Sequence, residues 1–189
     1  MRGRERVPLS AAAGPATDTV RGTLFHGPAL LSGVPEPGED TEMEWWDALL
    51  ADMRAEAAAY EDGGWETLEL HPGDVTARDG SVEDLGLDVL VPDNEFADLE
   101  AALADGVDSY EVLRSTAGHY VALLFVIEAA GRDLAVFVPA YYSGRDDAAA
   151  TLLRKATEAG ELTLILRTLT DDRVELALDD PELLVPDGD

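Results

Sequence analysis

Residues 120–143 read YVALLFVIEAAGRDLAVFVPAYYS, and they contain two apolar runs joined by a short polar turn. The first run, Tyr120–Ile127, is almost entirely apolar, which is typical of a central strand covered on both faces. The second run is Leu134–Val138, and Ala130-Gly131-Arg132 between the runs fits a hairpin. The stretch therefore predicts two antiparallel strands at the centre of a sheet.

The residues before this stretch predict two helices and two strands. Apolar residues recur at helical spacing through Glu44–Asp62, and Gly63-Gly64 ends the repeat. Trp65–Leu70 alternates apolar and acidic residues like a half-buried strand, and Leu87–Val91 predicts another strand after a polar loop. Asp93 is placed to cap a second helix.

The segments on either side of the central pair complete the predicted order. Ser109–Arg114 predicts a strand before the pair, and Ser143 with Asp146 forms a capping box, S-x-x-D, for a helix that ends at Gly160. A final hairpin is predicted with strands at Leu162–Leu169 and Val174–Leu178. The order α-β-β-α-β-β-β-α-β-β predicts an α+β fold, with helices covering a largely antiparallel mixed sheet.

The composition is strongly acidic. The 189 residues carry 40 acidic and 13 basic side chains, a net charge of -27, and Lys155 is the single lysine. This pattern predicts a halophilic protein, because molar salt screens charge repulsion to within about 3 Å. Disorder is not expected, since 46% of the residues are hydrophobic and fall in periodic blocks. Mimicry of DNA or binding to a basic partner is the alternative explanation.

Several classes of function are not expected from this composition. The chain has no cysteine, which excludes disulfides, thiolate metal sites and thiol catalysis. The sequence shows no basic patch for direct nucleic-acid binding, and no apolar run approaches the roughly 20 residues of a membrane helix. Because no secretory signal is evident either, the predicted location is cytoplasmic.

Residues 1–42 differ in composition from the remainder. They are rich in proline, glycine, alanine and serine, and up to Val34 they hold four arginines and only two acidic residues. One interpretation is a disordered or loosely docked arm ahead of a single domain at 43–186. The other is that the natural protein starts at Met43.

Two histidines are candidates for chemistry because imidazole titrates near neutral pH. His71 lies in His71-Pro72-Gly73-Asp74, where Asp74 could orient it, although this sequence also fits a plain turn. His119 precedes the apolar central strand, a position that also fits a boundary residue. No spacing typical of a metal site links them, so neither a metal nor a cofactor is predicted.

Tyr141 and Tyr142 follow the second apolar run. Alternation along a strand directs one ring inward and the other outward, which makes an exposed hydroxyl beside a pocket the alternative to a structural role. The element order from Asp93 to Leu169 also matches restriction-endonuclease-like nucleases, but the acid-x-Lys of their third strand is absent. The order from Glu44 to Gly160 matches dimerising modules of the roadblock type, an analogy of fold alone.

Four segments together resemble an uncharacterised family of small haloarchaeal proteins, a domain of unknown function. They are Trp45-Trp46-Asp47, Gly64-Trp65-Glu66-Thr67 with the His71–Asp74 turn, His119 and Val138-Pro139-Ala140-Tyr141-Tyr142. The resemblance covers roughly Met43 to Pro186. It implies an archaeal, cytoplasmic protein and transfers no activity and no catalytic residues.

The leading functional hypothesis is a salt-adapted, non-enzymatic protein-interaction or self-associating module. The core pattern is sound and no convincing catalytic set accompanies it, so a homo-oligomer or a protein partner is expected. The alternative is a small ligand- or metal-binding protein, or an enzyme, that uses His71, Asp74, His119 and Tyr141 or Tyr142. This alternative requires the two histidines to converge beside a pocket.

Overall fold

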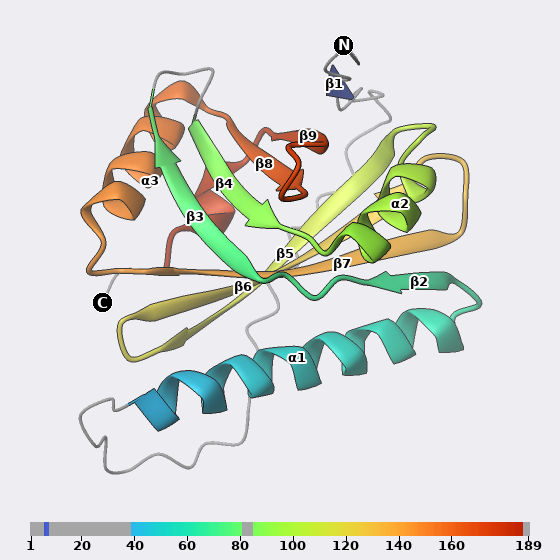
Figure 1. Ribbon diagram of the computed structural model, residues 1–189, viewed down its shortest axis with the longest axis horizontal. Helices are drawn as coiled ribbons and strands as arrows, with labels where there is room; N and C mark the ends of the chain where they lie inside the picture. The colour runs from blue at the N-terminus through green and yellow to red at the C-terminus, as the bar shows by residue number, and fades with distance from the viewer. Residues whose placement is uncertain (1–5, 8–38, 81–84, 187–189) are drawn as a thin grey trace.

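The two apolar runs form neighbouring strands, β6 (Tyr120–Ala129) and β7 (Leu134–Ser143), of a four-stranded sheet in the computed structural model (Figure 1). β5 (Val107–Ala117) pairs antiparallel with β6, and β2 (Glu66–Glu69) pairs parallel with β7. The order in this sheet is β2-β7-β6-β5. The central position predicted for residues 120–143 is therefore confirmed.

The structure describes residues 6–7, 39–80 and 85–186. Most of the predicted arm, at 1–5 and 8–38, lies outside these residues. The first helix, α1 (Glu39–Asp62), starts upstream of Met43, so four residues of the segment assigned to the arm are helical.

A second, five-stranded sheet has the order β1-β9-β8-β4-β3. Its pairs are antiparallel except β4 with β8 and β1 with β9. Its strands are β1 (Arg6–Val7), β3 (Asp74–Asp79), β4 (Leu85–Leu90), β8 (Leu162–Arg167) and β9 (Arg173–Leu178). The sequence predicts one sheet, and the structure divides the strands between two.

The strand β3 lies where the sequence predicts a polar loop. Val75 and Ala77 pack against the core while the alternate residues are more exposed, because β3 is the edge strand of its sheet. A strand at the edge of a sheet, with one face exposed to water, carries few apolar residues. Its alternation of apolar and polar residues is therefore weak.

The two sheets enclose the main hydrophobic core, and α1 covers the other face of the four-stranded sheet (Figure 1). Alternation along β6 explains its apolar sequence: Phe125 and Ile127 point into the core between the sheets, and Leu124 and Val126 pack under α1. The helix α3 (Asp147–Ala159) packs on β3 and β4, and α2 (Asp93–Ala102) lies beside β7. This architecture confirms the α+β class, and the predicted helices and strands follow one another in the predicted order, with β1 and β3 in addition.

Two predicted helix caps differ from the structure. The side chain of Asp146, rather than that of Ser143, caps α3 by accepting a hydrogen bond from the Ala148 N–H at 3.0 Å. Ser143 Oγ instead accepts a hydrogen bond from the Arg145 N–H at 3.2 Å. Asp93 is the first residue of α2, and the N-cap position is occupied by Pro92, which makes no side-chain capping hydrogen bond. Within the described residues, no helix is both long and apolar enough to span a bilayer.

Candidate functional site

His71 follows β2 and is held by the first turn of α2. Its backbone N–H donates to Glu95 Oε2 at 2.7 Å, and its ring Nδ1 lies 3.1 Å from Glu95 Oε1. Asp74 does not orient the imidazole; it accepts a hydrogen bond from Thr76 Oγ1 at 3.2 Å. The contacts of His71 therefore fasten the end of β2 to α2.

His119 occupies the turn between β5 and β6, where its ring lies against Tyr120 with 4.1 Å between ring centroids. The position of each histidine along β7 follows from hydrogen bonds. Leu70, next to His71, donates to the Phe137 carbonyl, whereas the His119 carbonyl accepts from Gly144. Phe137 and Gly144 are seven residues apart, and seven residues of extended chain span about 20 Å. The structure does not bring the two histidines together.

Tyr141 and Tyr142 point to opposite faces of the four-stranded sheet, as alternation predicts. Tyr142 is buried and its hydroxyl donates to the Leu184 carbonyl at 2.6 Å. Burial raises the pKa of Tyr142 to about 12. Tyr141 is half-buried on the α1 side, with its ring centroid 5.2 Å from Trp45 and 5.8 Å from Trp46.

The rings of Trp45, Trp46, Tyr120 and Tyr141 form one cluster at the start of α1. Trp45 stacks on Tyr120 at 5.2 Å, and the remaining pairs meet edge to face. The Trp45 Nε1 is buried without a hydrogen-bond partner among the described residues. The rings pack against one another. This packing supports a structural role for the two tryptophans.

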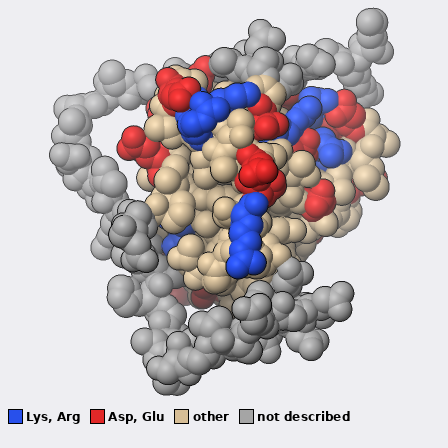
Figure 2. All heavy atoms as spheres, turned by 90° about the vertical axis from the view of Figure 1, so that its left-hand side faces the viewer, with Lys and Arg blue, Asp and Glu red and all other residues tan. Residues whose placement is uncertain are grey.

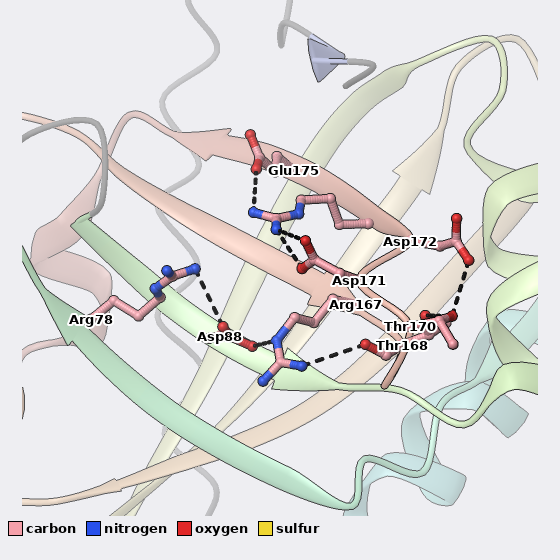
Figure 3. Close-up of polar contacts among 9 residues, drawn as sticks. Arg78, Asp88, Arg167, Thr168, Thr170, Asp171, Asp172 and Glu175 are labelled. Atoms are coloured by element: carbon pink, nitrogen blue, oxygen red, sulfur yellow. Dashed lines mark hydrogen bonds and ion pairs between the residues drawn. The ribbon is translucent and has the colours of Figure 1, made fainter. Parts of the chain in front are cut away.

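A polar network lies on the face of the five-stranded sheet that points away from the core (Figure 3). Asp88 of β4 is buried and accepts hydrogen bonds from Arg167 Nε at 2.6 Å and from Arg78 Nη1 at 3.4 Å. Farther along the same face, Arg173 pairs with Asp171 and Glu175. The Asp88 ion pairs link β4 to its neighbours β3 and β8, whereas the Arg173 pairs stay within β9 and the turn before it.

Sequence reasoning missed this network, although one signal was present. Asp88 interrupts the otherwise apolar or glycine sequence of β4, and a single carboxylate in such a strand indicates a paired charge. No group of three or more histidine or acidic side chains among the described residues could hold a metal ion. Asp88 therefore serves as a shared carboxylate that holds β3, β4 and β8 together.

An open groove of about 580 Å³ lies where the end of α1, β2, α2 and the turn between β6 and β7 meet. Its apolar lining comes from Trp65, Leu68, Ala102 and Leu134. Leu134 and Ala102 belong to the main core, and Leu68 packs against it. The volume falls in the range of binding sites for small molecules and peptide side chains.

Four charged residues line the same groove: Glu61, Glu66, Asp98 and Arg132. Glu61 Oε1 accepts a hydrogen bond from Thr67 Oγ1 at 2.7 Å, and Arg132 Nη1 donates to the Ala101 carbonyl at 3.2 Å. Within the described part of the chain, the carboxylates of Glu66 and Asp98 form no hydrogen bond or ion pair. Both are exposed.

The strand β2 presents an open edge beside this groove. The N–H groups of Glu66 and Leu70 donate to Asp133 and Phe137, which places their hydrogen bonds on the β7 side. Backbone direction alternates along a strand, so Thr67 and Glu69 direct their N–H and C=O groups away from β7. Among residues 6–7, 39–80 and 85–186, no strand pairs with that side of β2. In Figure 1, β2 lies between α1 below it and α2 above it.

Residues 36–186 match a protein family described as a family of unknown function (DUF7529). The chain belongs to this family. The match confirms the resemblance to an uncharacterised domain. The groove, the aromatic cluster and both histidines all lie inside the DUF7529 match. No curated protein and no solved structure matches the chain.

Proposed function

We propose that this chain is a non-enzymatic protein-interaction module that binds an extended segment of a partner protein along β2. The observation that carries the proposal is the open edge of β2 inside a groove with an apolar lining. Strand addition of this kind uses backbone hydrogen bonds for affinity and side-chain pockets for specificity. Thr67 and Glu69 supply the backbone groups, and the apolar surface around Leu68 and Ala102 supplies the pocket.

The alternative, an enzyme or metal-binding protein built on His71 and His119, has less support. The two residues lie beside different parts of β7, His71 near Phe137 and His119 near Gly144. Each has a local contact, His71 with Glu95 and His119 with Tyr120. The acidic surface gives no separate support for binding a basic partner over one whole face. Figure 2 shows acidic side chains interspersed with basic and uncharged ones on the face that it displays.

We further propose the cytoplasm of a halophilic archaeon as the setting of this interaction. The 40 acidic residues and the single lysine support it, together with the resemblance to haloarchaeal proteins. In molar salt, long-range attraction is screened to about 3 Å. A module in that solvent must rely on close contacts such as backbone pairing and apolar packing.

A random octapeptide display library, selected in molar KCl, tests strand addition. Enriched peptides should bind the wild type and Thr67→Val but lose most of their affinity for Thr67→Pro. Both variants lose the hydroxyl that bonds to Glu61, but only proline removes the outward N–H. Enriched peptides that bind Thr67→Pro as tightly as Thr67→Val, or a library without enrichment, would contradict the proposal.

Self-association through β5 is a second candidate function. β5 spans 11 residues at the end of the four-stranded sheet, and β6 is its only partner among the described strands. A long edge strand is a template for pairing with another chain. The ladder of β5 with β6 is regular from Ser109 to Ala117, which leaves a straight edge for a second copy.

Thr116 allows this second candidate to be tested without disturbing the core. The Gly144 N–H donates to the His119 carbonyl, so the backbone groups of His119 face β7 and, by alternation, those of Tyr120 face β5. Tyr120 pairs with Ala117, whose backbone groups therefore face β6. The N–H of the preceding residue, Thr116, consequently faces away from β6. Thr116 is exposed. Sedimentation velocity in molar KCl should show a dimer for the wild type and Thr116→Ala and a monomer for Thr116→Pro. A monomeric wild type would remove this candidate.

A further inference from the structure

The two sides of the groove along β2 both carry a carboxylate. Thr67 points toward α1, where it bonds to Glu61, and Leu68 points toward the core side of the sheet, where α2 contributes Asp98 to the lining. A segment that adds to β2 therefore lies between Glu61 on one side and Asp98 on the other.

An extended segment directs successive side chains to opposite sides. Two neighbouring residues of a bound segment consequently face Glu61 and Asp98, one each. Basic side chains suit both positions, because lysine and arginine can pair with a carboxylate at the tip while their stems cover the apolar lining. The indole of Trp65 also lines the groove, and aromatic faces attract cations.

Arg132 limits how many basic residues the groove accepts. Its contact with the Ala101 carbonyl places it about one helical turn along α2 from Asp98. One turn of helix, about 5.4 Å, is close to the spacing of about 6.6 Å between alternate residues of a strand. A residue two positions away from the one that faces Asp98 would therefore lie near a guanidinium, which disfavours a third basic side chain.

From this geometry we infer that the partner segment is an extended peptide with two adjacent basic residues. The inference rests on the proposed function, since it requires strand addition at β2, and it adds the chemistry that selects the segment. Among the described residues, the carboxylate of Asp98 makes no hydrogen bond, and Glu61 can pair with a basic side chain through Oε2 while Oε1 keeps its bond to Thr67. The occupant is a segment of another protein.

Two capped octapeptides test the inference: Thr-Val-Thr-Lys-Arg-Thr-Val-Thr and the same host with Glu-Asp at the centre. Fluorescence anisotropy measures the binding of each peptide in molar KCl. At this salt concentration the general attraction between a basic peptide and a chain of net charge -27 is screened, and only direct contacts remain. Exposed ion pairs are individually weak, so two of them should give roughly a threefold to tenfold preference for the Lys-Arg peptide.

The double variant Glu61→Gln, Asp98→Asn should lose this preference. A matched control, Asp47→Asn with Glu100→Gln, removes the same charge from exposed positions of α1 and α2 outside the groove and should keep it. Equal binding of the two peptides by the wild type, or an equal loss of preference in the control, would overturn the inference.

The variant Thr67→Pro separates this failure from a failure of the proposed function. If both peptides bind equally and Thr67→Pro weakens both, strand addition stands and the basic preference falls. If the Lys-Arg peptide binds Thr67→Pro as tightly as Thr67→Val, both the function and the inference fall. The variant Ala101→Phe, which fills the groove from an exposed position, should block the Lys-Arg peptide, whereas Ala97→Phe on the same helix should not.

Discussion

Asp88 illustrates how much one buried charge depends on residues that are distant in the sequence. Arg78 comes from the neighbouring edge strand, and Arg167 comes from a strand almost 80 positions later (Figure 3). The sequence places an aspartate in an apolar strand, but it does not say which cations lie beside it. The candidates that sequence reasoning selected, such as His71 and His119, were chosen by residue type, and residue type carries no information about distance.

Replacing Asp88 by alanine should destabilise the fold by about 2 kcal/mol, because the two arginines lose a shared carboxylate and the strands lose a link. This is below the cost for a fully buried pair, since the arginine side chains remain 36% and 29% exposed. Denaturant unfolding in molar KCl measures the change. Asp105→Ala, at an exposed turn position, is the control, and equal effects of the two variants would contradict the account.

The hydroxyl of Tyr142 should make stability fall at high pH. Its pKa is raised from 10.0 to about 12 by burial, so the unfolded chain loses this proton first as pH rises. The neutral hydroxyl contributes fully to the free energy of unfolding below pH 10, and this contribution is lost progressively toward pH 12. Tyr142→Phe should be less stable near neutrality, because it loses the bond to Leu184, but should show a shallower decline between these pH values. An unchanged slope would contradict the assignment.

At the scale of elements, prediction succeeded where a segment has a strong pattern of its own. The two central strands and the α3 helix have apolar residues at clear spacings, and each was predicted close to its observed place. β3 was missed because its exposed edge position removes the apolar signal. The division into two sheets was missed because it depends on the parallel pairs β4–β8 and β2–β7, which join segments far apart in sequence.

The groove was also missed, because it depends on contacts between segments that are far apart in the sequence. Its apolar lining includes ordinary core residues such as Leu68, Ala102 and Leu134, and its most informative feature is a backbone edge. Neither has a signature in a single sequence. The groove forms because α2 packs beside β7, with Leu134 at the start of that strand in the lining.

Gly86 provides a test of the pairing between β4 and β8. A Cβ at this position would lie 2.1 Å from the Thr163 carbonyl oxygen, a backbone atom that cannot move without breaking the pair. Gly86→Ala should therefore cost about 3 kcal/mol of stability. Gly73→Ala is the matched control, because its added Cβ would meet only Leu90 Cδ2 at 3.9 Å. Thermal unfolding of both variants decides the point, and two equal melting temperatures would argue against this close approach.

At the scale of the whole molecule, the chain carries a net charge of -27. Acidic side chains repel one another across the surface, and this repulsion opposes the compact state unless salt screens it. Figure 2 shows that basic residues are interspersed among the acidic ones on one face, so part of the repulsion is already offset there.

Lowering KCl from molar concentration to about 0.1 M should therefore destabilise the protein, because the screening length grows from about 3 Å to about 10 Å. Circular dichroism during thermal unfolding, recorded over a series of KCl concentrations, measures the effect. The melting temperature should rise steadily with salt. A melting temperature that does not depend on salt would contradict the halophilic interpretation.

The most direct test of the binding proposal is amide hydrogen exchange of β2, measured residue by residue by NMR in molar KCl, with and without a peptide selected on the wild type. Leu68 has its N–H on the β7 side, whereas Thr67 and Glu69 direct theirs to the open edge. The peptide should slow exchange at Thr67 and Glu69 and leave Leu68 almost unchanged. Unchanged exchange at Thr67 and Glu69, with protection appearing elsewhere in the chain, would contradict it.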